Sequence, residues 1–538
     1  MANNPVFRSN INIGQNGAEN DEDFLINCFV DHPALAELVD LNSPALFALG
    51  STGIGKTAIL KMIEHQEEHC NPLEVHDMAM THLANSDTIA FLQSLDIDLS
   101  LFFQALWKHV LCIEFIKLVI NEQDREKFWI SVRNVLLNPN RGVITERLRT
   151  FVEENENKFW NTIDQNVIEL TDKLESSVNS ELGVEVEKFK LKAGYARSLS
   201  GEKRVQLQQR AKKFVNQTSI AELSSVISGL AEYTRGRQDR YFITIDGLDE
   251  NWVDSSIKYQ LIQALFESLR GLRKLRNFKA IVALRSDLFH KMIGDSQVSR
   301  GQFEKYSDLV VQVKWTKEQL WRLAERRIGY LFSRKYSSEN VHFYDIFLNK
   351  VDGKVATWNY LIERTLNRPR DVINFINSAL QASEGKTSVS KTDFLRGEGI
   401  YSDLRLETLV YEWGVTFPDI RGQLALLVGR PEYFQASEIM TSKTIEEIYD
   451  RGTAMYELQQ DPLWTVVTAS INGDLDPYKI GATIFQRLHL VGAVGLKVSS
   501  STPWNWIAQT NKVVPEHSID AATKVKIHPM LYRALNTA

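Results

Sequence analysis

Gly50-Ser51-Thr52-Gly53-Ile54-Gly55-Lys56-Thr57, or GSTGIGKT, is the stretch that decides the fold. Its glycines, lysine and hydroxyl residue stand at the offsets of a phosphate-binding loop. The apolar run before it, residues 45–49, predicts a buried parallel strand. Residues 58–63 after it have the spacing and composition of a helix. We therefore expect main-chain N–H groups at the start of that helix to cradle a polyphosphate.

Two side chains of the loop, and one carboxylate elsewhere, have expected roles in binding ATP with Mg²⁺. Lys56 would reach the β- and γ-phosphates, and Thr57 would hold the metal ion. Residues 241–245, YFITI, form a β-branched and aromatic run that favours a buried strand. Asp246 would then emerge at the carboxyl end of that strand, where α/β sheets bind ligands. Thr57 and Asp246 are thus expected to hold Mg²⁺, either directly or through its waters.

Three further residues are candidates for the chemistry at the γ-phosphate. Asp249 and Glu250 lie on the loop that follows Asp246, and either one could polarise an attacking water. Residues 278–284 predict a third strand, which Arg285 follows. Arg285 is placed either to sense the γ-phosphate or to form a structural ion pair with Asp246 or Asp249.

Two helices with clear start signals follow this part of the chain. Residues 309–315 predict a fourth strand, after which Thr316 opens a helix as N-cap and Gln319 completes a capping box. The stretch 367–371, NRPRD, begins another helix that continues over 372–379. Arginines in a first helical turn oppose the helix dipole. They indicate an anionic partner, which is either a nucleotide phosphate or a nearby carboxylate.

Composition and charge narrow the class of protein. The chain has 538 residues, more than a single core usually holds, and is 43% hydrophobic and 24% charged, as globular proteins are. A net charge of −6 gives no overall attraction to nucleic acid or anionic membranes. Its three cysteines are scattered, and its first residues lack signal-peptide features, which indicates a cytoplasmic protein. The most apolar long segment, 101–120, contains three charged residues and predicts a core helix, without membrane contact.

A long insertion separates the two halves of the expected site. Lys56 and Asp246 are 190 residues apart, far more than one strand-helix-strand crossover requires. After a second strand around 73–78, residues from about 100 to 235 are expected to form a largely helical insertion. Its segment 185–213 holds nine basic and three acidic residues. This segment is either a solvated helix face or a surface for nucleic acid or an acidic partner.

The last part of the chain predicts helices followed by a β-hairpin. Helices are expected at 404–413, 436–450 and 480–489, and strands at 491–498 and 522–527. This order suggests a winged-helix module. Its last portion, 476–538, carries seven basic and three acidic residues, compatible with DNA contact. Winged helices of ATPases also dock proteins, and that reading is favoured here over DNA.

The motifs GSTGIGKT, FITIDGLDE, IVALRSD and NRPRDVI, in this order, resemble those of the AAA+ and STAND branch of P-loop ATPases. The resemblance covers roughly residues 10–110 and 220–395. The stretches GAEND at 17–21 and IHPM at 527–530 are similar to a poorly characterised bacterial P-loop ATPase family, related to ATPases of anti-phage conflict systems. KAP-type ATPases have similar motifs but commonly carry membrane helices, and the sequence predicts none here.

The resemblance implies a role for each matching residue. Lys56 and Thr57 would be the Walker A pair and Asp246 the Walker B residue, with Asp249 or Glu250 as the catalytic acidic group. It also implies a sensor 1, a sensor 2 and an arginine finger, at Arg285, Arg370 and Arg300 respectively.

These observations together give an expected architecture and function. The expected fold is α/β, a P-loop NTPase parallel sheet with a large helical insertion, a helical lid and a C-terminal α+β winged-helix-like module. Its expected domains are 1–315, 316–400 and 401–538. The expected function is that of a regulatory ATPase whose nucleotide state controls homo-oligomerisation or a separate effector protein, in anti-phage defence. The alternatives are a DNA-binding loader or remodeller similar to origin-recognition ATPases, and a nucleotide-binding scaffold that scarcely hydrolyses ATP.

Overall fold

The computed structural model describes most of the chain in two compact units. The described residues are 6–75, 99–119, 238–249, 255–295, 306–335, 341–351, 353–473, 477–510 and 512–537, with a few isolated positions between 89 and 234. The sheet unit comprises Asp31–Ser51 and Lys56–Lys314. The helical unit comprises Met1–Val30, Thr52–Gly55 and Trp315–Ala538. The central residues of the glycine loop thus cluster with the helical unit, and its two ends cluster with the sheet unit.

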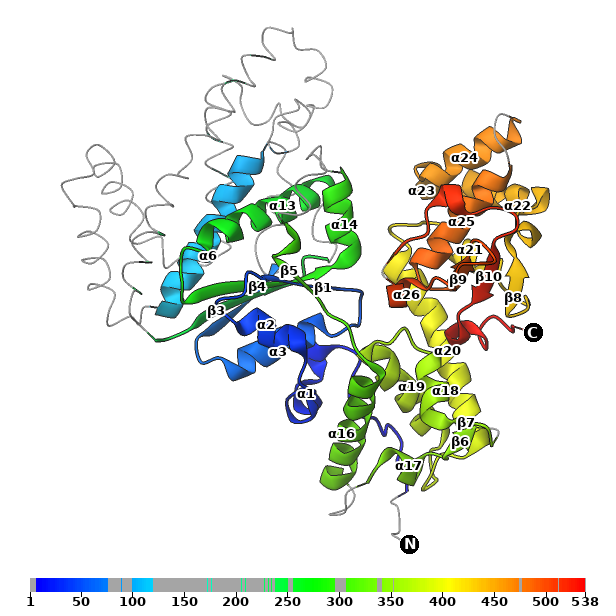
Figure 1. Cartoon of the computed structure of the whole chain (residues 1–538), viewed down its shortest axis with the longest axis horizontal. Coiled ribbons are helices and arrows are strands. Elements are labelled where there is room, and N and C mark those ends of the chain that lie inside the picture. The colour runs from blue at the N-terminus through cyan, green and yellow to red at the C-terminus, as the bar shows by residue number, and fades with distance from the viewer. Residues whose placement is uncertain are drawn as a thin grey trace, which may run out of the picture. The chain divides into compact units, whose positions relative to one another are not determined.

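The sheet unit contains the predicted parallel sheet (Figure 1). Its strands are β1 (Phe47–Gly50), β2 (Cys70–Glu74), β3 (Tyr241–Asp246), β4 (Phe278–Arg285) and β5 (Val310–Gln312). They are all parallel and lie in the order β2-β3-β4-β1-β5. Nearly every residue of β1, β3 and β4 is buried, as expected when helices cover both faces of a parallel sheet. Because β4 lies between β1 and β3, the ends of these three strands are neighbours.

Helices cover both faces of this sheet (Figure 1). Those on one face are α2 (Pro33–Val39) and α3 (Lys56–Gln66), and those on the other are α6 (Ser100–Val119), α13 (Ser255–Leu272) and α14 (Ser286–Asp295). The helix α6 confirms the predicted core helix, and its Trp107 Nε1–H donates to the Leu261 oxygen at 2.9 Å. The rings of Phe47 and Phe266 stack at 3.6 Å between centroids and so join β1 to α13.

Several predicted features lie outside the described residues. Apart from α6 and isolated positions, these include the helical insertion over 100–235 and its basic segment 185–213. Glu250 and Arg300 also lie outside the described residues.

The helical unit begins with the N-terminal segment and continues from Trp315. Its first elements are η1 (Ala18–Asn20), α1 (Glu22–Cys28), α16 (Lys317–Lys335), α17 (Phe343–Ile346), β6 (Lys350–Val351), β7 (Val355–Ala356), α18 (Thr357–Glu363), α19 (Pro369–Ala382) and α20 (Lys391–Trp413). The predicted capping box of α16 is confirmed: the Thr316 N–H donates to Gln319 Oε1 at 2.9 Å, and the Gln319 N–H donates to Thr316 Oγ1 at 3.2 Å. The helix α19 starts with Pro369, whose fixed φ suits a first helical position.

The C-terminal part of the helical unit combines helices with a small antiparallel sheet. Its helices are α21 (Ile420–Ala425), η8 (Ala436–Glu438), α22 (Ser442–Ala454), α23 (Tyr456–Gln459), α24 (Pro462–Ile471), α25 (Pro477–Leu490), α26 (Ile507–Thr510), η9 (Glu516–Ser518) and η10 (Pro529–Leu531). The predicted hairpin is present as β9 (Val494–Lys497) paired with β10 (Lys524–Ile527). A strand that was not predicted, β8 (Tyr433–Gln435), pairs with the other edge of β10.

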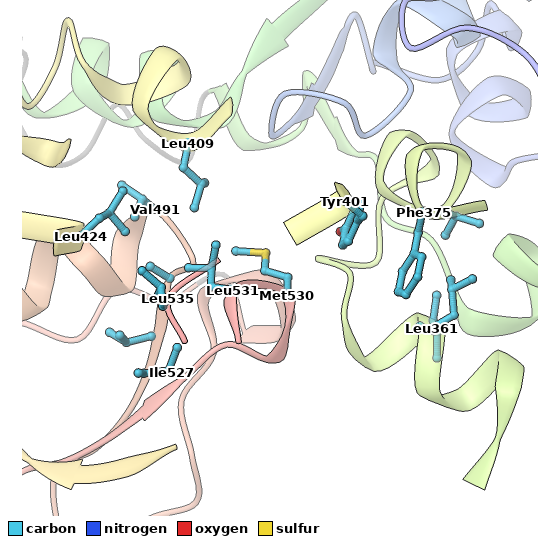
Figure 2. Close-up of a cluster of buried hydrophobic side chains, with 14 of the residues drawn as sticks. Leu361, Phe375, Tyr401, Leu409, Leu424, Val491, Ile527, Met530, Leu531 and Leu535 are labelled. Atoms are coloured by element: carbon cyan, nitrogen blue, oxygen red, sulfur yellow. The ribbon is translucent and has the colours of Figure 1, made fainter. Parts of the chain in front are cut away.

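The long helix α20 ties the C-terminal part to the helices before it (Figure 2). Tyr401 on α20 stacks against Phe375 of α19, with ring centroids 4.8 Å apart and an interplanar angle of 10°. The next residue of α20, Ser402, donates from its Oγ to the Met530 oxygen at 2.7 Å. The hydrophobic core of this unit is therefore continuous from α19 to η10.

Candidate functional site

The backbone of the glycine loop has the conformation that only glycine adopts readily. The strand β1 ends at Gly50 and α3 begins at Lys56. Gly53 and Gly55 have φ of +76° and +97°, in the left-handed region. A Cβ added at Gly53 would lie 3.0 Å from both Cβ and Cδ of Arg370, so this position lacks space as well as conformational freedom for a side chain.

Three successive carbonyl groups of the loop accept hydrogen bonds from residues of the helical unit. Arg368 Nη1 donates to the Thr52 oxygen at 2.7 Å, and Trp315 Nε1 donates to the Ile54 oxygen at 2.7 Å. Between them, the Arg370 N–H donates to the Gly53 oxygen at 3.4 Å. Among the described residues, the N–H groups of Gly53 and Ile54 meet no hydrogen-bond acceptor. Successive unpaired N–H groups of this kind form an anion-binding nest.

Lys56 is held within the sheet unit at the start of α3. It is 8% exposed, and its Nζ donates to the Gly50 oxygen at 3.2 Å and to the Ser51 oxygen at 3.1 Å. Burial lowers the pKa of Lys56, and the carboxylates of Asp249 and Asp246 act against this shift. The ammonium thus has two carbonyl partners and two nearby carboxylates, and a phosphate could take the place of the carbonyl contacts.

Asp246 ends β3 as predicted, close to Thr57. Burial raises the pKa of its carboxyl to about 6, while hydrogen bonds from the Thr57 side chain and the Gly247 N–H lower it. The Gly247 N–H donates to Asp246 Oδ1 at 2.9 Å. A hydroxyl and a carboxylate are oxygen ligands of the kind that Mg²⁺ takes, and Mg²⁺ usually needs only one or two of them besides water and phosphate. The described residues contain no cluster of three or more His, Cys, Asp or Glu suited to a metal ion.

Arg285 lies beside the start of the glycine loop because of the strand order. In the ladder that pairs β1 with β4, Gly50 is opposite Arg285. The guanidinium donates to both carboxylate oxygens of Asp287, from Nε at 2.9 Å and from Nη2 at 2.8 Å. The positive charge of Arg285 also contributes to lowering the pKa of Lys56. Sequence reasoning weighed Asp246 and Asp249 as partners for Arg285 and missed Asp287, which is only two residues along the chain.

Arg368 is the residue of the NRPRD stretch that sequence reasoning passed over. Arg370, chosen from the resemblance, is half-buried, and its Nε donates to the Asn16 oxygen at 3.0 Å. Arg368 is 3% exposed and donates to both oxygens of Asp371, from Nε at 3.1 Å and from Nη2 at 3.2 Å. Its remaining Nη1 reaches the Thr52 oxygen. Spacing alone could not distinguish the two arginines, which stand two residues apart at a helix start.

A buried ionic network continues from Arg368 into α20. The guanidiniums of Arg368 and Arg405 lower the pKa of Asp371 to about 2, against the effect of burial. Arg405 Nη1 lies 3.6 Å from Asp371 Oδ1 and 3.9 Å from Glu412 Oε1. The loop carbonyl of Thr52 is therefore connected through Arg368 to charged groups of two helices.

The N-terminal GAEND stretch also contacts α19 through the segment before it. Asn16 accepts from Arg370, and Asp21 forms a buried ion pair with Arg327 Nη2 at 2.6 Å. The Gln15 N–H donates to Asp21 Oδ1 at 2.7 Å. The pairing with Arg327 had no sequence signal, because the two residues are 306 positions apart.

Comparison with known proteins finds one family model that matches a part of the chain. Residues 318–410, which run from α16 into α20, match the family model of the FunZ-associated C-terminal helical domain. No curated protein and no solved structure matches the chain. Within the described residues, no helix combines the length and apolar character needed to cross a membrane. The finding from known proteins is therefore a similarity to the FunZ-associated helical domain over residues 318–410.

Proposed function

We propose that this chain is a regulatory ATPase that binds ATP with Mg²⁺ and hydrolyses the γ-phosphate bond. The proposal rests on the hydrogen bonding of the glycine loop. Its carbonyl groups already accept hydrogen bonds, whereas the N–H groups of Gly53 and Ile54 are left to bind an anion. The loop runs directly into α3, and a helix start favours negative charge. A polyphosphate fits this arrangement better than a neutral ligand does.

The residues around Lys56 support hydrolysis rather than binding alone. Lys56 would leave its carbonyl partners for the phosphates, while Thr57 and Asp246 would hold Mg²⁺. When bound, Mg²⁺ would neutralise charge on the phosphate oxygens. Asp249, three residues after Asp246, is a carboxylate that could orient the attacking water. Its negative charge acts to raise the pKa of Lys56. Arg285 would add positive charge from the neighbouring strand end.

The regulatory part of the proposal rests on how the loop is anchored. Arg368 connects the Thr52 oxygen to Asp371 and thereby to Arg405 on α20. A phosphate that reshapes the loop would change this buried network within the helical unit. In this proposal the module containing α25, β9 and β10 is winged-helix-like and responds to the nucleotide, so that the chain assembles with itself or with a separate effector protein. The placement in anti-phage defence rests on the resemblance of the motifs.

ATP turnover by Lys56→Ala and by a matched variant of the same helix tests the proposal. Lys61→Ala is the control, because Lys61 is a half-buried residue of the same helix α3 and pairs with Glu64 at 3.2 Å. We expect turnover to be abolished by Lys56→Ala and unchanged by Lys61→Ala, with phosphate release measured under Mg²⁺. Normal ATP hydrolysis by Lys56→Ala would show that the assignment of the ATP site is wrong.

A second measurement separates the ATPase from a nucleotide-binding scaffold. The mass of the full chain is measured with ADP and with a non-hydrolysable ATP analogue, beside phosphate release over time. We expect the analogue to change the assembly state and phosphate to be released. Tight retention of ATP without phosphate release would reject the ATPase hypothesis and support the nucleotide-binding scaffold.

A further inference from the structure

The outer face of the small sheet formed by β8, β10 and β9 differs in character from its inner face. Val525, the central residue of the inner face, is fully buried beside its partners Phe434 and Leu496. Because strand residues alternate between faces, Lys524 and Lys526 point to the outer face. The residues opposite them in the register share this face: Lys497, Gln435, Tyr433 and Gly495.

Two of these lysines stand directly opposite each other. Lys497 on β9 pairs with Lys524 on β10 in the antiparallel register. Like charges in such a pair repel and destabilise the sheet. Among the described residues, neither lysine has a carboxylate within 4.0 Å of its nitrogen. The three strands themselves contain no acidic residue. The face therefore concentrates positive charge without compensating it.

Aromatic side chains border the lysines on this face. Tyr433 is 53% exposed, and the Lys526 Nζ lies 4.7 Å from its ring centroid and donates to its hydroxyl at 2.8 Å. The Trp504 ring is 6.0 Å from that of Tyr433. An isolated antiparallel bridge between Leu496 and Asn505 places Trp504 at the β9 edge. The exposed ring of Tyr433, with the half-buried ring of Trp504 near it, offers a flat apolar surface beside a cationic group.

The acidic residues nearest in sequence are engaged elsewhere. Burial raises the pKa of the Tyr532 hydroxyl, and Glu432, which accepts a hydrogen bond from that hydroxyl, raises it further. Glu438 accepts from the Gln435 N–H at 2.9 Å and pairs with Arg430 at 3.6 Å. The positive face is thus open to an external anion.

We propose that this face binds single-stranded nucleic acid. Lys497 and Lys524 would each contact a backbone phosphate, and Tyr433 would stack on an unpaired base with Trp504 beside it. An acidic peptide would satisfy the lysines but would leave the exposed ring without a flat partner. Stacking on aromatic side chains next to a cationic groove is how proteins bind single strands regardless of sequence. This inference concerns a different ligand and a different surface from the ATP site.

Binding of labelled oligo(dT) and oligo(U) by the full chain, followed by fluorescence anisotropy at increasing salt, tests the proposal. The double variant Lys497→Gln/Lys524→Gln should weaken binding at least about tenfold and reduce the salt slope by about 1.4, the value for two lost contacts with single-strand phosphates. Tyr433→Leu should weaken binding of both oligonucleotides about tenfold through lost stacking. The two oligonucleotides also distinguish a DNA ligand from an RNA ligand.

The matched control is Lys354→Gln/Lys443→Gln, which removes the same charge from two exposed lysines outside the sheet. We expect it to bind the oligonucleotides as the wild type does. Absence of binding at low salt, or an equal loss in the control, would overturn the proposal. So would a duplex that binds more tightly than the single strand and is insensitive to Tyr433→Leu. Displacement of the oligonucleotide by poly-glutamate at equal charge concentration would instead indicate an acidic protein ligand and reject the proposal.

Discussion

Arg368 donates a hydrogen bond from Nη1 to the main-chain oxygen of Thr52 at 2.7 Å, while its other nitrogens hold both oxygens of Asp371. The guanidinium is 3% exposed, so these bonds form away from water. A planar guanidinium can hold a carboxylate through two parallel hydrogen bonds and still donate to a carbonyl, in a fixed geometry that the point charge of an ammonium does not provide. The position of the loop backbone at Thr52 therefore depends on a residue 316 positions away in the sequence.

Replacing this arginine by lysine is expected to weaken nucleotide binding. Arg368→Lys keeps the charge beside Asp371 but loses the fork that also reaches Thr52. We expect the Kd for a fluorescent ATP analogue to rise about tenfold, the equivalent of one charged hydrogen bond. The thermal unfolding temperature should also fall, because Asp371 is fully buried.

The control for this prediction is Arg364→Lys in the same helical unit. Arg364 also forms an ion pair, partly buried, from Nε to Glu398 Oε1 at 2.5 Å, and its guanidinium lies 3.4 Å from the Tyr360 ring centroid. This variant should lower the unfolding temperature without changing the Kd. If both variants bind the analogue equally well, Arg368 has only a structural role.

The raised pKa of Asp246 predicts a conflict between stability and function. Its ordinary value is 3.8 and the folded value is about 6, because burial disfavours the carboxylate. The contribution of this group to the free energy of unfolding is therefore complete below about pH 4 and is lost as the pH rises through about 6, a change of about 3 kcal/mol. The Asp246→Asn variant cannot ionise at this position, so its free energy of unfolding should not decrease in this way and should exceed that of the wild type at pH 7. The same variant should lose Mg²⁺-dependent hydrolysis.

Urea unfolding at pH 4 and pH 7, without Mg²⁺ or nucleotide, measures this effect. Other titrating groups are common to the two proteins, so the difference between the wild type and Asp246→Asn isolates the single carboxyl. An Asp246→Asn protein that is no more stable than wild type at pH 7 would show that the carboxylate is not penalised by burial.

The sequence predicted those features that are encoded over a few neighbouring residues. Apolar runs predicted β1, β3 and β4, and the spacing of Thr316 and Gln319 predicted the start of α16. The order of the strands is set by contacts across the sheet, so the pairing of Gly50 with Arg285 had no local signal. Tertiary packing also decides which of the two arginines at the start of α19 reaches the Thr52 oxygen with its side chain, and the sequence has no local signal for this difference between Arg368 and Arg370.

One strand was missed and one helix was predicted too short, each for an identifiable physical reason. The strand β8 is only three residues long, too short for an alternating pattern to be recognised. The helix α20 was predicted from residue 404 but begins at Lys391, and glycines in its first half lower the helix propensity. One of them, Gly397, is required by packing, because a Cβ there would lie 2.5 Å from Ala379 Cα. Close approach of α19 thus overrides the local preference.

Two glycines with the same backbone conformation should respond differently to alanine. Gly53 has φ of +76° and Gly353 has φ of +71°, so alanine costs about 1 kcal/mol of strain at either position. A Cβ at Gly53 would also meet Arg370 at 3.0 Å, whereas at Gly353 it would meet nothing within 4 Å. We expect Gly53→Ala to abolish binding of the ATP analogue and Gly353→Ala to leave it unchanged. Equal binding by both variants would contradict the proposed role of the loop.

Two ion pairs of the N-terminal segment should differ strongly in their contribution to stability. The side chains of Asp21 and Arg327 are each 4% exposed, whereas those of Asp23 and Arg334 are 53% and 54% exposed. Asp21→Ala leaves an unpaired buried guanidinium and should lower the free energy of unfolding by about 3–5 kcal/mol. Asp23→Ala should leave it nearly unchanged, because water screens the exposed pair. Chemical unfolding of the two variants measures the difference. A small effect of Asp21→Ala would mean that water reaches Arg327, and that the N-terminal segment is held mainly by its apolar contacts.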